Sequence, residues 1–398
     1  MNVILFDDPS IRQDLSPFTL TRPVSEIRVG ILTVTEKWER HLKTKVSYQT
    51  IDYLQEKYPT KNSADNLLVN GAVCPDEKLI QAIGTLSEEQ GLSKDGVLLA
   101  ARNTNTSLEN IQQTEYPGEV TLIDQVWKIF QYNGTQIKSD FELLTKGRKS
   151  NDLNDAHTIV YGEVGKDIFI EEGAIIKAAI LNAENGPIYL GKNTQVQEGS
   201  MIRGPFALCE GSHVNMGAKI RGDSTVGPYS KVGGEISNSV IFGFSNKGHD
   251  GFLGNSVIGE WCNLGADTNT SNLKNNYENI KIWNYKKGGF KDTGLQFCGL
   301  IMGDHSKCGI NTMFNTGTVV GIGCNIFGDG FPRTFIPSFA WGGAAGFTTF
   351  QLNKMLDTAE KVYERRSKTL AASDKKILQH LFESTSANRV WEKKTDKA

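Results

Sequence analysis

Aliphatic residues recur every six positions through the middle of this 398-residue chain. The uninterrupted run is Leu190, Val196, Ile202, Leu208, Val214, Ile220, Val226 and Val232. The residues four positions after each of the first seven are mostly small: Thr194, Ser200, Phe206, Ser212, Ala218, Ser224 and Ser230. A period of six matches neither a helix nor an alternating strand, and it is typical of a hexapeptide solenoid whose short strands alternate with corners. A β-sandwich is the alternative, but its turns drift at spacings of about 8 to 12 residues.

The six-residue pattern fails twice and then resumes. It resumes first at Phe252, Ile258 and Leu264, and later at Met302, Cys308, Phe314, Val320 and Ile326. The first interruption covers residues 242–259, and the second runs from Leu264 to about Phe297. Because a regular solenoid can be purely structural, we expect function where the period breaks.

Glycine content marks the extent of the solenoid. The chain has 41 glycines, concentrated between Gly162 and Gly346, and that share of about a tenth exceeds the usual value of about 7%. Glycine allows the positive φ angles that tight corners need, so we expect it to supply those corners. We therefore predict that the solenoid occupies residues 151–335.

The flanking zones predict two other folds. Residues 1–150 have the pattern of an α/β domain, and residues 336–398 that of a cap and a helical tail with a solvated charge run. The expected amino-terminal elements are strands at Val3–Phe6, Asn66–Asn70 and Val97–Ala101, with helices at Glu36–Leu42 and Pro75–Gly84. In the last zone, Ile336–Gly342 is expected to cover the end of the prism, and the helix has apolar positions at Leu352, Leu356, Ala359 and Val362.

Charge, hydropathy and cysteine usage limit the binding partners and the compartment that we expect for this protein. The formal net charge of −2 argues against a nucleic-acid binder. No apolar stretch reaches the ~18 residues of a membrane span, and the amino terminus lacks a basic leader. The six cysteines contain no CxxC pair, so we expect a protein of the reducing cytoplasm without a disulfide framework. No trio of histidines suits zinc, and we predict no bound metal in the solenoid.

The six-residue repeat resembles the left-handed parallel β-helix of the hexapeptide-repeat transferases. In that family three hexapeptides make one triangular coil, and the left-handed sense departs from the usual right-handed crossover. The resemblance implies a homotrimer with coenzyme A bound between subunits.

The interruptions carry a more specific resemblance. The chain presents His249, Phe252, Leu253-Gly254-Asn255, Ile258-Gly259, Asn263-Leu264-Gly265-Ala266-Asp267 and Asn272-Leu273-Lys274, in that order. This order is similar to the acetyltransferase half of the bifunctional N-acetylglucosamine-1-phosphate uridyltransferase/glucosamine-1-phosphate acetyltransferases. Two positions depart from the family, since Phe252 replaces a tyrosine and Asp267 replaces a glycine.

The resemblance assigns a role to each position. His249 is implied as the general base, since an imidazole can accept the proton of the attacking amine near neutral pH. The implied sugar and phosphate ligands are Arg221, Phe252, Asn263, Asn272, Lys274 and Lys281. Ala266, Ile310 and Gly328 are implied along the path of acetyl-CoA. The structural alternatives are a corner histidine for His249 and a solvated side chain for Arg221, and we expect His213 and His305 to be structural.

The amino-terminal zone resembles sugar nucleotidyltransferases with altered parts. Leu15-Ser-Pro-Phe-Thr-Leu-Thr-Arg22-Pro23 is similar to a family element, and Val69-Asn-Gly-Ala72 is similar to its Asn-Gly-Asp. The glycine-rich phosphate loop is replaced by Phe6-Asp-Asp-Pro-Ser10, and Ala72 stands where an aspartate would hold Mg²⁺. Active and inactive forms of this domain both remain open, and only an active one would use Mg²⁺. Arg22 and Arg28 are the phosphate candidates, although for Arg28 we favour a solvated face.

Three hypotheses follow for the whole chain. The first is an acetyl-CoA-dependent N-acetyltransferase acting on glucosamine-1-phosphate or a related hexosamine-1-phosphate in UDP-N-acetylglucosamine synthesis. The second is a sugar-1-phosphate uridylyltransferase whose β-helix serves assembly. The third is a non-catalytic solenoid that senses sugar phosphates.

Overall fold

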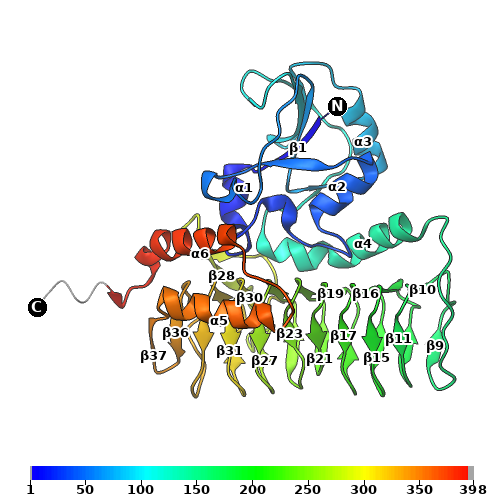
Figure 1. Cartoon of the computed structure of the whole chain (residues 1–398), viewed down its shortest axis with the longest axis vertical. Coiled ribbons are helices and arrows are strands. Elements are labelled where there is room, and N and C mark those ends of the chain that lie inside the picture. Colours follow the sequence, from blue (N-terminus) through cyan, green and yellow to red (C-terminus); the bar gives the residue numbers. More distant parts are fainter. Residues whose placement is uncertain (1, 393–398) are drawn as a thin grey trace, which may run out of the picture. The chain divides into compact units, whose positions relative to one another are not determined.

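The chain folds into two compact units. The computed structural model describes residues 2–392, so the last part of the charged tail, residues 393–398, lies outside the described residues. Of the described residues, the first unit comprises 2–28, 32–126 and 372–377, and the second comprises 29–31, 127–371 and 378–392 (Figure 1). This division places residues 127–150 with the second unit, whereas the sequence-based boundary at residue 150 stays a prediction.

The first unit is built on a six-stranded mixed sheet with the order β2-β1-β3-β6-β5-β7. Strand β1 is parallel to β2 and β3, while β6 runs antiparallel to β3 and β5. The sheet strands are β1 (Asn2–Phe6), β2 (Val46–Gln49), β3 (Asn66–Asn70), β5 (Gln90–Lys94), β6 (Val97–Asn103) and β7 (Gln112–Glu115). The other elements are the pair β4 (Val73–Cys74) and β8 (Thr121–Leu122), with helices α1 (Pro9–Asp14), α2 (Val34–Leu42) and α3 (Glu77–Gly84). The three predicted strands and two predicted helices are confirmed.

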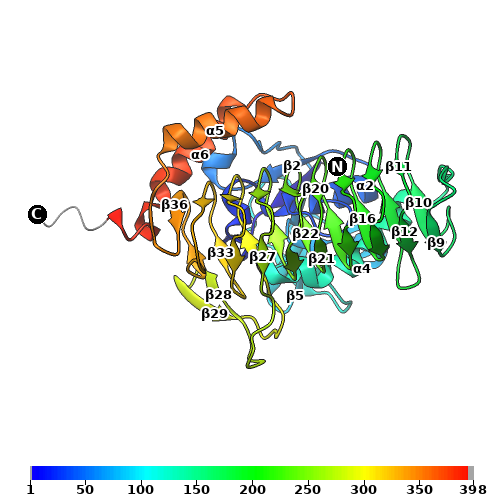
Figure 2. The ribbon, with the colours of Figure 1, turned by 90° about the horizontal axis from the view of Figure 1, so that it is seen from below.

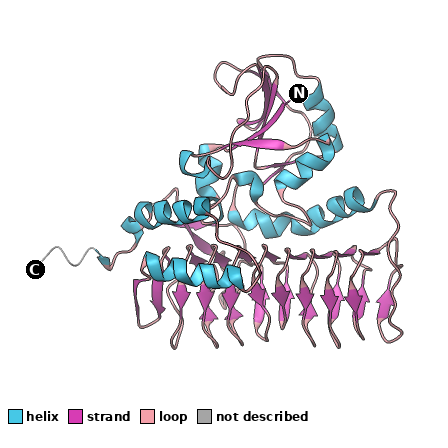
Figure 3. Cartoon of the chain, in the orientation of Figure 1, coloured by secondary structure: helices cyan, strands magenta, loops and turns pink. Residues whose placement is uncertain are grey.

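The second unit is a parallel β-helix with three faces (Figure 3). The nine-strand face contains β10 (Ile168–Ile170), β13 (Ile188–Leu190), β16 (Phe206–Leu208), β19 (Ser224–Val226), β22 (Val240–Ile241), β25 (Val257–Ile258), β30 (Ile301–Met302), β33 (Val319–Val320) and β35 (Phe335–Ile336). The ten-strand face contains β11 (Ile175–Ile176), β14 (Gln195–Val196), β17 (His213–Val214), β20 (Lys231–Val232), β23 (Asn246–Lys247), β26 (Asn263–Leu264), β31 (Lys307–Cys308), β34 (Asn325–Ile326), β36 (Ala340–Gly343) and the antiparallel β37 (Gly346–Thr349). The six-strand face contains β9 (Ile159–Tyr161), β12 (Ile180–Asn182), β15 (Met201–Arg203), β18 (Lys219–Ile220), β21 (Glu235–Ser237) and β24 (Phe252–Gly254), and the pair β27 (Asn269–Thr270) and β32 (Met313–Phe314) continues beside β24.

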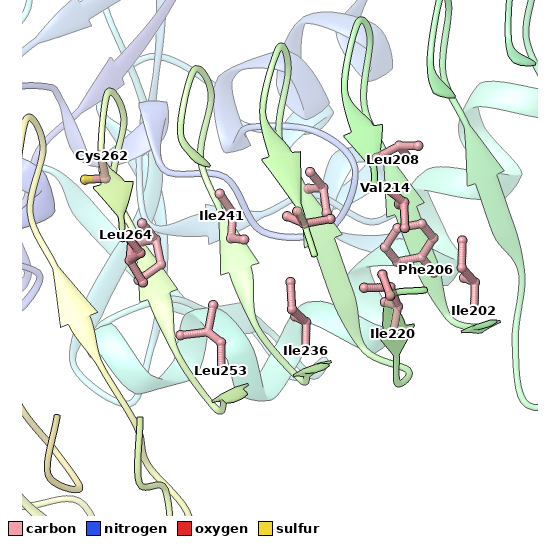
Figure 4. Close-up of a cluster of buried hydrophobic side chains, with 14 of the residues drawn as sticks. Ile202, Phe206, Leu208, Val214, Ile220, Ile236, Ile241, Leu253, Cys262 and Leu264 are labelled. Atoms are coloured by element: carbon pink, nitrogen blue, oxygen red, sulfur yellow. The ribbon is translucent and has the colours of Figure 1, made fainter. Parts of the chain in front are cut away.

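The six-residue pattern becomes a stack of in-register coils. Val196 pairs with Val214, and Val214 pairs with Val232, so each regular coil contains 18 residues. The repeated aliphatic side chains point into the prism, where they form ladders from coil to coil (Figure 4). The polar residues four positions later, such as Ser212 and Ser230, are also fully buried. Their hydroxyls donate to carbonyls of the next coil, as Ser212 Oγ does to Gly227 O at 2.7 Å. The predicted left-handed parallel β-helix is confirmed.

Both interruptions change the length of a coil. Val232 pairs with Lys247, only 15 residues on, so this coil is shorter than its neighbours. Leu264 pairs with Cys308, and the intervening chain leaves the prism after β27. It forms a projecting hairpin of β28 (Lys281–Asn284) and β29 (Gly289–Asp292) before it returns at β30 (Figure 2). Residues 242–259, which we expected to break the solenoid, still form the strands β23, β24 and β25.

One inward step after the shortened coil spans five residues instead of six, from Leu253 to Ile258. Leu253 is fully buried and pairs with the inward Ile236, whereas Phe252 is half-buried and pairs with the outward Glu235. The predicted resumption of the inward pattern at Phe252 is therefore wrong, and Leu253 takes that place.

Glycines in the β-helix serve close approach between coils as well as corners. A Cβ at Gly265 would lie 2.4 Å from the carbonyl carbon of Gly309 in the next coil, and Gly265 does not have a positive φ angle. Conversely, Phe244 and Trp261 occupy corners with φ angles of 62° and 61°. The expectation that glycine supplies left-handed corners is confirmed at Gly199, Gly211 and Gly217, whose φ angles are 74°, 65° and 70°. It does not hold at Gly265, where glycine leaves room for stacking, or at the two aromatic corners.

Helices and a final strand cover two faces of the β-helix. Helix α4 (Val126–Thr145) lies on the nine-strand face, where Phe141 packs edge-on against Phe169 at 6.5 Å. Helix α5 (Leu352–Glu364) lies on the ten-strand face, and α6 (Ala372–Ser384) follows it, which confirms the helical tail. Strand β37 pairs antiparallel with β36, the last parallel strand of the ten-strand face.

Two further findings concern the described chain as a whole. None of its helices is both long and apolar enough to cross a membrane. All six cysteines are buried and free of disulfide bonds.

The inward phase can be tested with two neighbouring substitutions. We expect Leu253→Ala to cost about 2 to 5 kcal/mol, because it removes a buried side chain from a close-packed ladder. Phe252→Ala removes a half-buried outward ring and should cost less than about 1.5 kcal/mol. The midpoint of urea denaturation, followed by circular dichroism, compares the two variants. Equal losses, or a larger loss for Phe252→Ala, would contradict this phase.

Candidate functional site

A cavity of about 830 Å³ lies between helix α5 and the ten-strand face. Four of the predicted site residues line it: His249, Asn263, Ala266 and Ile310. These residues come from the first interruption, from the start of β26, from the corner after β26 and from the corner after β31, yet coil stacking brings them together. The structure thus joins the predicted base with one predicted sugar ligand and two of the three predicted acetyl-CoA positions.

The cavity wall is strongly basic. Its cationic side chains are Lys231, Lys307, Arg365 and Arg366, and none of its described lining residues is acidic. Burial lowers the pKa of Lys307, and burial with the neighbouring Arg365 lowers the pKa of Arg366. Lys307 and Arg366 thus carry their charges where little water can solvate them, and Arg366 is also repelled by Arg365. An anionic ligand would offset that unfavourable environment.

Two of these cations are engaged and two are available. The guanidinium of Arg366 donates to Tyr229 O at 2.8 Å and to Asn246 Oδ1 at 3.1 Å, which ties the end of α5 to the β-helix. Lys307 Nζ donates to His305 O at 3.0 Å. Among the described residues, the side chains of Lys231 and Arg365 have no hydrogen-bond or ion-pair partner, so they can bind a ligand.

An aromatic stack holds α5 over this cavity. The ring of Trp261 lies between Phe244 and Tyr363, with centroid distances of 4.2 and 3.8 Å. Phe244 stacks in turn on Tyr229 at 5.3 Å. Three successive corners therefore present their rings outward, and Tyr363 of α5 extends the stack.

His249 sits at an exposed corner between β23 and β24. It also lines an adjoining cavity of about 640 Å³, which shares Asn215, Gly248, His249 and Ala266 with the first. The imidazole has no hydrogen-bond partner among the described residues. It is therefore free to exchange a proton with a ligand in either cavity, and the structural alternative of a hydrogen-bonded corner histidine finds no partner here.

Phe252 and Asn272 meet on the six-strand face. The Asn272 amide donates to Asn255 Oδ1 at 2.8 Å. A Cβ at Gly254 would lie 2.6 Å from both Phe252 Cζ and Asn272 Nδ2, so the glycine is what lets these two groups converge. This pair lies outside the two cavities that contain His249.

Arg221 lies further along the same face, in a third cavity. It forms an ion pair with Glu235 at 2.9 Å, and Glu235 pairs with Phe252 across β21 and β24. Its cavity of about 640 Å³ also contains Arg203 and Lys138. Arg221 is therefore one coil from Glu235 and two coils from Phe252, rather than beside His249.

The remaining predicted residues line none of these cavities. Lys274 is engaged within its own loop, where Nζ donates to Asn279 O at 3.1 Å. Lys281 is exposed on the projecting strand β28. Gly328 is exposed, with a φ angle of 101° and open space around it. The structure does not bring these three residues together with the others.

Sequence reasoning missed the cations of the main cavity. A signal for two of them was present, because Lys231 and Lys307 each precede an inward residue of the ten-strand face and so share its outward row with Asn263. Arg365 and Arg366 follow α5, about 60 residues beyond Lys307, and no periodicity connects them to the coils.

In the amino-terminal unit, helix α1 begins where the phosphate loop is expected. The Asp8 carboxylate accepts from the backbone N–H groups of Ser10 and Ile11, at 2.8 and 3.0 Å, and so caps α1. Asp7 is buried in an ion pair with Arg12 at 2.7 Å, and burial raises the pKa of Asp7. Backbone N–H groups that would cradle a phosphate are thus already used.

The other expected nucleotide ligands are also changed. Ala72 is buried and offers no carboxylate at the position expected to hold Mg²⁺. Arg28 is buried and forms an ion pair with Glu36 at 3.4 Å, so the predicted solvated face for Arg28 is wrong. Arg22 is buried as well.

Comparisons with known proteins find a family model for the amino-terminal part of the chain and several related full-length proteins. Residues 3–149 match the sugar nucleotidyl transferase family model. The chain is 28% identical to the bifunctional protein GlmU of Methanococcus aeolicus over 296 residues, which cover 65% of this chain and 70% of that protein. It is 32% identical to GlmU of Methanocaldococcus jannaschii over 179 residues, or 44% of this chain and 41% of that protein.

More distant similarities involve acetyltransferases. A putative uncharacterized acetyltransferase of Escherichia coli, YaiX, is 26% identical over 148 residues, or 37% of this chain and 64% of that protein. The solved structure of the polySia specific acetyltransferase NeuO aligns over 48% of this chain and 86% of its own, at 16% identity and with a TM-score of 0.28. The chain is therefore similar to bifunctional GlmU proteins, and its residues 3–149 are similar to sugar nucleotidyl transferases.

Proposed function

We propose that the chain is an acetyl-CoA-dependent N-acetyltransferase acting on glucosamine-1-phosphate or a related hexosamine-1-phosphate, in the synthesis of UDP-N-acetylglucosamine. The observation that carries this proposal is the main cavity, in which the free imidazole of His249 faces a wall with four cations and no described acidic side chain. A proton acceptor beside a polyanion site is the combination that acetyl transfer from coenzyme A to an amine needs.

In the proposed reaction a single proton passes through His249, from the amine to the departing thiolate. The amine nitrogen of the sugar attacks the thioester carbonyl, and the C–N bond forms as the carbonyl oxygen gains negative charge. His249 accepts the amine proton, and collapse of the tetrahedral intermediate breaks the C–S bond. The imidazolium then returns the proton to the departing thiolate, so the products are the acetylated sugar phosphate and free coenzyme A.

The cavity wall suits coenzyme A as a co-substrate. Ala266 and the largely exposed Ile310 offer apolar surface for the pantetheine arm. Lys231 and Arg365 are available to the phosphate groups, because charge-assisted hydrogen bonds favour cations without other partners. Gly328 lies outside the cavity, and we propose it only as a contact for the end of coenzyme A that is remote from the thioester.

The sugar phosphate would lie toward the six-strand face. Asn263 is beside His249, while Phe252 and Asn272 form a second contact surface around the next corner. Arg221, with Arg203 and Lys138, is the strongest cationic group on that side. Lys274 and Lys281 belong to the projecting excursion and are proposed as weaker sugar or phosphate ligands.

The remaining proposals concern assembly and location. We propose a homotrimer in which a neighbouring subunit completes the coenzyme A site, as the β-helix resemblance implies. Free, buried cysteines suit a reducing compartment, and we propose that the enzyme is cytoplasmic.

Replacing His249 tests the catalytic role. We expect His249→Ala to lower kcat for acetylation of glucosamine-1-phosphate by about 10²-fold or more, since general-base catalysis is lost. The matched control is His213→Gln, which alters a histidine of the same face that lines neither His249 cavity. Acetyl transfer at the wild-type rate by a folded His249→Ala protein would remove this proposal. Binding of the sugar phosphate without turnover by the wild type would instead favour the sensing hypothesis.

Replacing Arg365 tests the coenzyme A site. We expect Arg365→Gln to raise KM for acetyl-CoA roughly tenfold, because a charge-assisted hydrogen bond contributes about 1.5 to 3 kcal/mol. Lys361→Gln is the control, because it removes a cation of α5 that does not line the cavity. Equal KM values for the two variants would place the co-substrate elsewhere.

The family match of residues 3–149 favours uridylyl transfer as a second candidate function. We nevertheless expect no pyrophosphate release from UTP, N-acetylglucosamine-1-phosphate and Mg²⁺, because Ala72 supplies no metal ligand and Asp8 uses the loop N–H groups. A coupled pyrophosphate assay on the full chain measures this, and its positive control is an active uridylyltransferase. Turnover would show that a different set of residues holds the metal and the nucleotide.

A further inference from the structure

One inward position of the ten-strand face is occupied by a lysine. The ladder on this face consists of Ile176, Val196, Val214, Val232, Lys247, Leu264, Cys308 and Ile326. Lys247 is 1% exposed, and it is the charged member of an otherwise apolar row. Burying an ammonium group in such a row is costly unless its hydrogen bonds are satisfied, so the contacts of its Nζ atom are decisive.

The ammonium group donates to backbone carbonyls of the His249 corner. Lys247 Nζ contacts the carbonyl oxygens of His249 and Asp250, the latter at 2.8 Å, and reaches Gly233 O at 3.5 Å. The carbonyl of Gly248 accepts from the Asn215 amide at 2.7 Å. Three successive carbonyls of this corner are therefore held by side chains.

Other corners of the same kind are held by the backbone. Two residues after the inward position, Glu198 O accepts from Gly217 N at 3.0 Å, and Ala266 O accepts from Asn311 N at 2.8 Å. The equivalent carbonyl at the short coil belongs to His249, and its donor is Lys247. The side chain of Lys247 thus supplies the hydrogen-bond donor that a backbone N–H of the next coil supplies at those two corners.

The short coil explains why a side chain is needed here. Val232 and the inward Ile236 are four residues apart, whereas Lys247 and the inward Leu253 are six apart. The corner that contains His249 is therefore longer than the Gly233-Gly234 corner stacked beside it. The Gly233-Gly234 corner is too short to offer a backbone N–H to every carbonyl of the longer His249 corner. Carbonyls that face away from water need another donor.

We propose that Lys247 is the positioning residue of this site, because its buried ammonium group fixes the backbone of the His249 corner and so sets where the imidazole meets the substrate amine. This inference rests on the proposed function, in which His249 is the base. Lys247 touches neither cavity, so it acts only through the corner that it holds.

The role depends on the charge state of Lys247. Burial lowers the pKa of Lys247 to about 8, and the nearby charges of Asp250, Asp267 and the Cys308 sulfur oppose that shift. An ammonium has three N–H donors for the three carbonyls, whereas the neutral amine has two. We therefore expect the corner to loosen as the pH rises through about 8.

Steady-state kinetics on the full chain test this role with two variants and a control. We expect Lys247→Met to lower kcat by about 10²-fold with KM for acetyl-CoA changed by less than about twofold, since displacement of a catalytic group by about 1 Å has effects of that size. Lys247→Arg keeps a cationic donor and should recover part of kcat. The control Val232→Ala weakens the same ladder one coil away and should leave kcat unchanged.

The pH profile separates positioning from a purely structural role. In the wild type we expect kcat to fall above about pH 8, and we expect this fall to be absent in Lys247→Arg, because the guanidinium stays protonated. The wild-type profile needs no variant, so it remains informative if a substitution prevents folding. A folded Lys247→Met protein with wild-type kcat, or a wild-type profile that is flat above pH 8, would overturn the proposal.

The experiments distinguish failure of the proposed base role of His249 from failure of the positioning role of Lys247. If His249→Ala abolishes acetyl transfer while Lys247→Met does not affect it, His249 remains the base and only the positioning role is lost. If His249→Ala is fully active, the proposed function itself is wrong, whatever Lys247→Met does.

Discussion

The β-helix depends on hydrogen bonds that run from each coil to the next. They fix every strand in register with its neighbours, as in the pairs Val196 with Val214 and Val214 with Val232. A strand of two or three residues contributes few such bonds, so order comes from stacking many equivalent coils. Any change in coil length must keep the inward ladders aligned, and the chain does this by altering corners. The proposed base, His249, lies in the corner stacked beside the shortened one.

The sequence allowed much of this architecture to be predicted, because the signal is local and periodic. The six-residue run, its polar partners and the excursion after Leu264 all correspond to features of the prism. The phase after the short coil could not be predicted in the same way. Both Phe252 and Leu253 are apolar, and only the backbone pairing with β21 decides which one points inward.

The candidate site was predictable only where its residues share a motif. His249, Asn263 and Ala266 follow one another in the chain and also line one cavity. The arginines after α5 come from a distant segment, and their placement depends on the stack of Tyr363 on Trp261. Lys247 was hidden for the opposite reason, since a search for aliphatic residues at inward positions passes over a lysine. The cavity of Arg221 also gathers like charges: Arg203 and Arg221 follow directly paired residues of neighbouring strands, and the ion pair of Arg221 with Glu235 offsets part of their repulsion.

The stacking of coils also bears on how such a protein can change in length. Each coil contacts only its neighbours, and the first regular coils, up to Val232, precede the altered corner of His249. Insertion or loss of one whole 18-residue coil among them would move the amino-terminal end of the prism by a single rung and leave the arrangement around His249 intact. A deletion of six or twelve residues would instead rotate every later face by a third or two thirds of a turn. The prism therefore tolerates length variation in whole coils, so that the corner of His249 and the number of coils can evolve separately.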